Sequence, residues 1–222
     1  MARRGTLNKC ALVIVALTLV SGEEDSTIRY VALGDSFTIG TSVEAVERWP
    51  NQLAARIPDL ELVANLGVNG FTSGDVIDDE LPALDAHDPE FVTLLIGVND
   101  VVQGVPEAEY AVNVRQIVEA LLERLPPDRI ACVATPDYTK TPQGAAFGDP
   151  DRQSQRIERV NATLESVCEE NGIAFVAATF AISQEAAHDP GLVAGDGLHP
   201  SGEQYGRWTD AMVPVIEDLL RD

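Results

Sequence analysis

The chain has 222 residues, of which 45% are hydrophobic, so it can form one domain with a sizeable core and is not a globally disordered protein. Its three cysteines exclude a disulfide-stapled miniprotein and a cysteine-rich zinc module. With 36 acidic residues against 15 basic ones the net charge is −21, which repels phosphate backbones and anionic lipid heads. We therefore expect no nucleic-acid partner. The acidity fits a protein kept soluble in high salt, and ordinary solvation or a GC-rich genome explains it equally well.

The first segment, residues 1–22, has the composition of a secretory signal peptide. Basic residues precede an apolar run over 10–20, and small residues follow it. The run is too short to span a bilayer comfortably as a mature helix. We therefore expect an exported protein that is cleaved after residue 22, with residues 26–222 forming a single domain and no stable membrane span. The alternatives are an uncleaved membrane anchor, or a cytoplasmic protein whose start codon was assigned too early.

Short apolar runs alternate with helical patterns along the rest of the chain. The runs are nearly continuous in apolar character, as in strands covered on both faces, and they comprise Ile28–Leu33, Leu60–Asn65, Phe91–Ile96, Arg129–Thr135 and Ile173–Ala177. The helical patterns comprise Trp49–Arg56, Ser73–Leu84, Pro106–Leu125, Asp151–Glu170, Phe180–Ala187 and Ser201–Leu220. This alternation predicts an α/β fold, a three-layer α/β/α sandwich with a five-stranded parallel sheet in the order 2-1-3-4-5.

In such a sheet, sites form where loops leave the carboxyl ends of the strands. We therefore expect chemistry just after each apolar run, and the one long loop, Pro136–Pro150, is a candidate specificity loop or lid. Trp49 and Trp208 are expected in the core. Cys132 and Cys168 are expected to be buried thiols rather than a disulfide.

Three polar motifs follow the first three apolar runs. The first run ends in Gly34-Asp35-Ser36, the second leads through Gly67 to Gly70, and the third is followed by Asn99. Each has an ordinary structural reading as well: a serine that caps a helix, a glycine-rich turn, or an asparagine that stabilises a loop. The functional reading is an exposed serine beside N–H groups that can stabilise an oxyanion.

Near the end of the chain, Asp196 and His199 stand three residues apart in a glycine-rich stretch. On a turn their side chains can meet, so that the carboxylate accepts from one ring nitrogen and leaves the other free as a base. The other two histidines, His87 and His188, lie in aspartate-rich stretches that are typical of solvated loops. A metal site is disfavoured, because no second His or Cys stands at ligand spacing.

Together these motifs resemble the four sequence blocks of the SGNH/GDSL hydrolase family, which includes lysophospholipase-like esterases. The blocks run in order from Gly34-Asp35-Ser36 through Gly70 and Gly97-Val98-Asn99-Asp100 to Asp196-Gly197-Leu198-His199-Pro200. No Gly-x-Ser-x-Gly elbow is present, so the larger α/β-hydrolase class is not indicated.

The resemblance implies a short α/β/α sandwich and a Ser-His-Asp esterase that needs no cofactor. By this resemblance Ser36 is the nucleophile, His199 its general base and Asp196 the residue that orients His199. The oxyanion hole would comprise the N–H groups of Ser36 and Gly70 and the side-chain amide of Asn99. Gly70 is preferred over Gly67 because it matches the family block.

Loop position alone suggests the residues of a substrate pocket, although most could equally anchor loops on the sheet: Phe37, Val98, Val101, Tyr138, Phe147 and Leu198. The expected substrate is a small-molecule, lipid or sugar ester, such as an O-acetyl ester or a lysophospholipid, and the expected state is a monomer. Two alternatives remain open: an O-acyltransferase using the same triad, and a non-catalytic binding domain with a vestigial site.

Overall fold

The protein is described by a computed structural model that covers residue 1 and residues 27–221, so the expected signal segment, apart from residue 1, lies outside the described residues. Five strands form one parallel sheet: β1 (Ile28–Gly34), β2 (Leu60–Asn65), β3 (Phe91–Leu95), β4 (Ile130–Val133) and β5 (Ala174–Val176). Their order across the sheet is β2-β1-β3-β4-β5. The predicted strands, the parallel sheet and the order 2-1-3-4-5 are confirmed.

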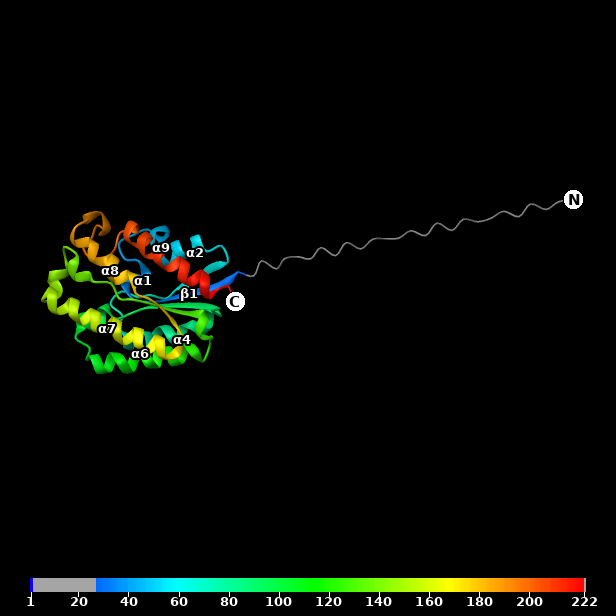
Figure 1. Ribbon diagram of the computed structural model, residues 1–222, viewed down its shortest axis with the longest axis horizontal. Coiled ribbons are helices and arrows are strands. Elements are labelled where there is room, and N and C mark those ends of the chain that lie inside the picture. Colours follow the sequence, from blue (N-terminus) through cyan, green and yellow to red (C-terminus); the bar gives the residue numbers. More distant parts are fainter. Residues whose placement is uncertain (2–26, 222) are drawn as a thin grey trace.

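Helices cover both faces of the sheet and make it the middle layer (Figure 1). One layer contains α1 (Ser36–Ile39), α2 (Trp49–Arg56), α8 (Ala178–Gln184) and α9 (Gly202–Leu219). The other contains α3 (Ser73–Asp75), α4 (Leu81–Leu84), α5 (Val98–Gln103), α6 (Glu107–Leu122) and α7 (Pro150–Asn171). The predicted three-layer sandwich is therefore confirmed.

The register of the sheet determines which loops meet. Gly34, the last residue of β1, pairs with Leu95, the last residue of β3. On the other side of β1, Ala32 pairs with Asn65 at the end of β2. Because the three strands end at one edge of the sheet, the loops that follow them lie next to each other.

The expected helix over Ser73–Leu84 is interrupted. It comprises α3, a π-helical turn over Val76–Glu80, and α4, and Pro82 lies in the first turn of α4. Thr72 caps α3 by accepting from the N–H of Asp75, whose carboxylate accepts from the N–H of Thr72 in return. The π turn places the buried side chain of Glu80 beneath the end of β1.

The core forms on both sides of the sheet and includes both tryptophans. Trp49 and Trp208 are fully buried, as expected, and the ring of Tyr205 meets that of Trp208 edge-on at 5.2 Å between centroids. Cys132 on β4 and Cys168 on α7 are buried free thiols, which confirms that prediction. Among residue 1 and residues 27–221, no helix has the length and apolar character needed to cross a bilayer.

Candidate active site

Ser36 is the first residue of α1 and follows a turn that only glycine can make. Gly34 adopts φ +146°, and a Cβ there would collide with the carbonyl oxygen of Leu95 on β3. Asp35 then caps α1, its Oδ1 accepting from the N–H of Phe37 at 2.9 Å. The side chain of Ser36 is therefore presented at the carboxyl edge of the sheet from a fixed turn.

Two buried carboxyl groups belong to this turn or contact it: Asp35 lies within it, and Glu80 lies beneath it. Glu80 Oε2 accepts from the N–H of Gly34 at 2.8 Å, and Glu80 is 2% exposed. Burial raises the pKa of Glu80 to about 9 against the opposing effect of the Gly34 N–H, and the nearby Asp35 carboxylate adds to the increase. Burial likewise raises the pKa of Asp35 to about 7, with Asp100 contributing in the same direction. The serine turn therefore adjoins two carboxyl groups whose ionised forms are disfavoured by burial, more strongly for Glu80 than for Asp35.

The loop after β2 contains two glycines in different environments. Gly67 packs so tightly on the serine turn that a Cβ would lie 2.9 Å from the carbonyl oxygen of Asp35. Gly70 instead has φ +86° and open space where a Cβ would stand. Its carbonyl accepts from Nε2 of Gln103 at 2.8 Å, while its N–H has no acceptor among residues 27–221. Gly67 thus has a packing role, and Gly70 has a free donor.

Asn99 lies in the first turn of α5, directly after β3. Its Nδ2 donates to the carbonyl oxygen of Phe71 at 2.9 Å and lies 3.5 Å from Oδ2 of Asp35. An amide nitrogen carries two hydrogens. The shorter bond to Phe71 fixes the side chain, and the second hydrogen makes only the long bond to Asp35, so it is available to a stronger acceptor in the cavity.

His199 and Asp196 meet on a turn between β5 and α9. His199 Nδ1 lies 2.7 Å from Oδ2 of Asp196, and Oδ1 of Asp196 accepts from the N–H groups of Leu198 and His199 at 2.9 and 3.0 Å. The ring of His199 also contacts that of Phe37, with 5.1 Å between centroids. With Nδ1 facing a carboxylate, the tautomer that leaves Nε2 as a proton acceptor is favoured.

Asp196 has one further partner that the sequence did not indicate. Ser42, in the loop after α1, donates from Oγ to Oδ2 of Asp196 at 2.6 Å. Partial burial acts to raise the pKa of Asp196, but the hydrogen bonds from Ser42, His199 and two backbone N–H groups outweigh it and hold that pKa well below its usual range. Asp196 is therefore an anion at neutral pH.

These elements meet at one cavity of about 40 Å³. Ser36, Asn99 and His199 all line it, together with Phe37, Val98, Val102, Tyr138, Phe147 and Leu198. The side chains of Ser36 and His199, both within the described residues, are not hydrogen-bonded to each other. Such bonds are often long without substrate and shorten in the complex.

Val101 differs from the sequence-based expectation. It is 1% exposed and packs in the core, whereas Val102 lines the cavity. The reason is helical geometry: Val98 and Val102 are four residues apart on α5 and share a face, and Val101 faces away from it. The other five residues expected in the pocket all line the cavity.

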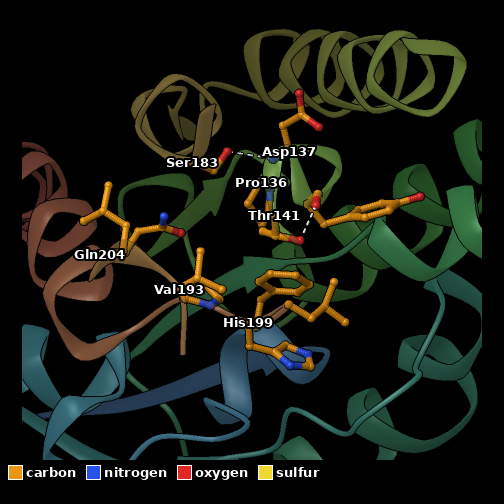
Figure 2. A pocket seen from close by; sticks show the side chains of 12 residues that line it. Pro136, Asp137, Thr141, Ser183, Val193, His199 and Gln204 are labelled. Carbon is orange, nitrogen blue, oxygen red and sulfur yellow. Dashed lines mark hydrogen bonds between the residues drawn. The ribbon is translucent and has the colours of Figure 1, made fainter. Parts of the chain in front are cut away.

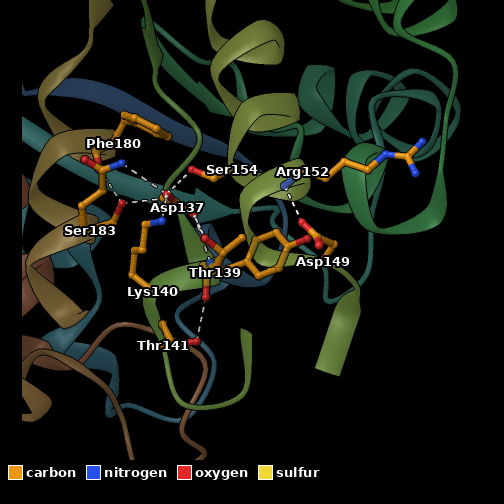
Figure 3. Close-up of polar contacts among 11 residues, drawn as sticks. Asp137, Thr139, Lys140, Thr141, Asp149, Arg152, Ser154, Phe180 and Ser183 are labelled. Atoms are coloured by element: carbon orange, nitrogen blue, oxygen red, sulfur yellow. Dashed lines mark hydrogen bonds and ion pairs between the residues drawn. The ribbon is translucent and has the colours of Figure 1, made fainter. Parts of the chain in front are cut away.

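The loop Pro136–Pro150 forms one wall of the cavity and is anchored by Asp137 (Figure 3). The buried carboxylate of Asp137 accepts from the N–H and Oγ1 of Thr139 at 3.1 and 2.6 Å and from Oγ of Ser154 at 2.6 Å. Lys140 Nζ lies 3.7 Å away. Beyond this anchor, the ring of Phe147 meets that of Tyr138 edge-on at 5.7 Å between centroids. The loop thus presents two aromatic rings to the cavity from a fixed base.

A second hollow lies between the loop and the histidine turn. Figure 2 shows His199 and Val193 facing Pro136 and Thr141 across it, with Ser183 and Gln204 on one side. Nearby, the N–H of Gln143 donates to the carbonyl oxygen of Gly197 at 3.0 Å. The long loop is therefore tied directly to the turn that carries His199.

No metal site is evident in the part of the chain that the structure describes, where no three His, Cys, Asp or Glu side chains gather in a ligand cluster. The sequence reasoning missed Ser42, Glu80, Val102 and Asp137. Ser42 lies 154 positions from Asp196, and no local pattern links the two. Glu80 gave a faint indication, because it stands four residues from both Val76 and Leu84 and is thus an acid on an apolar face of the expected helix.

Comparisons with known proteins identify a matching family and a related sequence. Residues 32–207 match the model of the GDSL-like lipase/acylhydrolase family. An arylesterase from Vibrio mimicus is 26% identical over 117 residues, which cover 50% of this chain and 56% of the arylesterase. The chain's match thus spans little more than half the length of that relative.

Solved structures share the fold. A lipase/acylhydrolase from Enterococcus faecalis superposes with a TM-score of 0.69 at 19% identity, covering 86% of this chain and 96% of that one. An acetylxylan esterase from Geobacillus stearothermophilus gives a TM-score of 0.64 at 21% identity, covering 86% and 94%. With the family match over residues 32–207, the chain belongs to the GDSL-like lipase/acylhydrolase family, a family of ester-bond hydrolases.

Proposed function

We propose that this protein is a serine esterase that hydrolyses carboxylic esters through Ser36, His199 and Asp196 and a covalent acyl-enzyme. One arrangement supports this most: Ser36, Asn99 and His199 line a single cavity, and His199 Nδ1 lies 2.7 Å from the carboxylate of Asp196. A nucleophile, an oriented base and an amide donor at one site are the parts that acyl transfer needs.

In the first half of the reaction, Ser36 Oγ attacks the ester carbonyl carbon and its proton moves to Nε2 of His199. The carbonyl π electrons move to the oxygen, giving a tetrahedral oxyanion. When the intermediate collapses, the C–O bond to the leaving alcohol breaks, and His199 donates the proton to the oxygen of that alcohol. In the second half, a water molecule takes the place of the alcohol, and the same steps release the carboxylic acid and free Ser36.

The oxyanion needs donors that are already in place. The N–H of Ser36 begins α1 and the N–H of Gly70 belongs to a turn, and neither has an acceptor among residues 27–221. Asn99 is held by the carbonyl of Phe71, and its second amide hydrogen makes only a 3.5 Å bond to Oδ2 of Asp35, which a bond to an oxyanion would replace. We infer that these three donors form the oxyanion hole, and the tight packing of Gly67 on the serine turn supports Gly70 over Gly67.

The cavity favours a small apolar acyl group. Its volume of about 40 Å³ lies well below the ~300–1,000 Å³ typical of ligand pockets. Apart from the reacting groups, its lining is aliphatic or aromatic. We therefore propose acetyl and short acyl esters as the preferred substrates. The longer chain of a lysophospholipid would have to extend past the exposed ring of Phe147 on the long loop.

Hydrolysis of p-nitrophenyl acetate and butyrate tests this function. The wild-type protein should release p-nitrophenol and one equivalent of the free carboxylic acid, the latter measured as acetate or butyrate by ¹H NMR. Ser36→Ala should abolish both, whereas Ser166→Ala, on the exposed face of α7, should retain wild-type turnover. Absence of Ser36-dependent turnover would contradict the proposal, and alcohol release without acid release would indicate acyl transfer instead.

A further inference from the structure

Ser42 has an unusual backbone for its residue type. It adopts φ +67°, in the left-handed region that non-glycine residues seldom occupy. Backbone strain of this kind persists when the surroundings fix it, and it is concentrated at functional sites. In Ser42 the strained residue carries a hydroxyl that reaches a carboxylate of the site.

That hydroxyl contacts the oxygen of Asp196 that also faces the base. Oδ2 of Asp196 lies 2.6 Å from Ser42 Oγ and 2.7 Å from His199 Nδ1. Since the ionised carboxylate can only accept, the hydroxyl of Ser42 must donate. The other oxygen, Oδ1, is held by two backbone N–H groups of its own turn.

The four groups that donate hydrogen bonds to the carboxylate of Asp196 come from two different parts of the chain. Three belong to the turn that carries Asp196 and His199, and only Ser42 comes from elsewhere, three residues after the end of α1. It is the direct side-chain link between the loop that follows the serine helix and the acid of the histidine turn. Without it, the orientation of the carboxylate about its own Cβ–Cγ bond would depend on its local turn alone.

We propose that Ser42 is a positioning residue of this site, whose hydroxyl fixes Asp196 and, through it, the ring of His199 relative to Ser36. The inference rests on the esterase function proposed above. Ser42 does not touch the reacting atoms, so its removal should slow the chemical step and leave substrate binding nearly unchanged.

Two substitutions separate the hydroxyl from the backbone. Ser42→Ala removes the hydroxyl and keeps a side chain at positive φ, and Ser42→Gly removes the hydroxyl and relieves the strain. Because hydrogen bonds to charged groups are the strong ones, we expect kcat for p-nitrophenyl acetate to fall about tenfold in both, with KM changed by less than about twofold. Ser42→Gly should unfold at a temperature no lower than wild type. Wild-type kcat in Ser42→Gly would overturn the proposal, because the backbone and not the hydroxyl would then explain any loss in Ser42→Ala.

A double-mutant comparison tests whether Ser42 acts through Asp196. In an Asp196→Ala background the acceptor is gone, so adding Ser42→Ala should lower kcat by less than about twofold. A further tenfold loss in that background would overturn the proposal, since Ser42 would then act by another route.

A measurement that needs no turnover separates this inference from the proposed function. The Nδ1–H proton of His199, bonded to Asp196, should give a downfield ¹H NMR signal that Asp196→Ala removes. In Ser42→Ala and Ser42→Gly we expect this signal to shift and to exchange faster with water. An unchanged signal in both variants would overturn the positioning role even if the protein is an esterase, and a changed signal would support it even if no ester is hydrolysed.

Discussion

The backbone N–H of Gly34 donates a 2.8 Å hydrogen bond to Oε2 of Glu80, a side chain that is only 2% exposed and lies beneath the serine turn. The other oxygen, Oε1, is buried without a partner among the described residues. A carboxyl group in this setting is more stable protonated, and burial raises the pKa of Glu80 to about 9. The turn that presents Ser36 therefore depends on a carboxyl group whose charge is disfavoured.

This predicts an effect of Glu80 on stability that depends on pH. Above the ordinary glutamate pKa the unfolded chain ionises Glu80 while the folded protein keeps its proton, so folding becomes less favourable as the pH rises toward about 9. Glu80→Gln has no proton to lose. One pKa unit corresponds to ~1.36 kcal/mol. We therefore expect the unfolding free energy of Glu80→Gln, minus that of wild type, to increase by at least about 1 kcal/mol from pH 5 to pH 8.

Urea denaturation at the two pH values measures this gain. Glu61→Gln, at an exposed position of β2, is the matched control and should follow the wild-type pH dependence. If the unfolding free energies of wild type and Glu80→Gln depended on pH in the same way, Glu80 would be ionised in the folded protein.

Asn99→Ala should lower kcat by roughly 10²–10³-fold with little change in KM, because an oxyanion-hole donor binds a charge that exists only near the transition state. Steady-state kinetics with p-nitrophenyl acetate measure kcat and KM separately. Asn113→Ala is the control, since its amide donates to Oγ of Ser73 outside the cavity. Equal kcat losses in the two variants would remove Asn99 from the oxyanion hole.

Val102→Phe should reduce the size of the acyl group that the site accepts. Forcing extra volume into a filled site typically costs about 1–3 kcal/mol, so kcat/KM for p-nitrophenyl butyrate should fall at least about tenfold more than that for the acetate. Val112→Phe, on the exposed face of α6, should leave the ratio unchanged. An unchanged ratio in Val102→Phe would mean that the acyl group binds elsewhere.

Asp137→Asn should loosen the long loop. Asp137 receives hydrogen bonds from Thr139 and Ser154, and bonds to a charged acceptor contribute about 1.5–3 kcal/mol. We therefore expect a loss of about that size in unfolding free energy by urea denaturation and a higher KM. Asp78→Asn, at an exposed position, should change neither. Wild-type stability in Asp137→Asn would show that the anchor does not hold the loop.

Much of the fold could be predicted from the sequence because the relevant forces are local and periodic. The strand Leu60–Asn65 and the helix Trp49–Arg56 have the predicted bounds, since apolar runs and Pro50 define them directly. The short helices α1 and α5 were not predicted, because four to six residues give no measurable period. The π turn before α4 was missed for a related reason: its one extra residue per turn leaves no trace in a periodic pattern.

Some residues of the candidate site could likewise be predicted from the sequence, and others could not. Asp196 and His199 could be paired from spacing, since three residues on a turn bring two side chains together. Val102 was missed by one residue, because the helical phase of α5 decides which valine faces the cavity. Ser42 could not be predicted, since its contact with Asp196 exists only once the sheet has brought two distant loops together.

Covalent labelling tests most directly whether Ser36 is a nucleophile that His199 activates. A fluorophosphonate reacts with a serine that an adjacent base has activated, so digestion and mass spectrometry of the treated protein should find one adduct, on the peptide that contains Ser36. His199→Ala should slow labelling by at least about tenfold, because the hydroxyl loses its base. No adduct on Ser36, or labelling at the same rate without His199, would contradict the account.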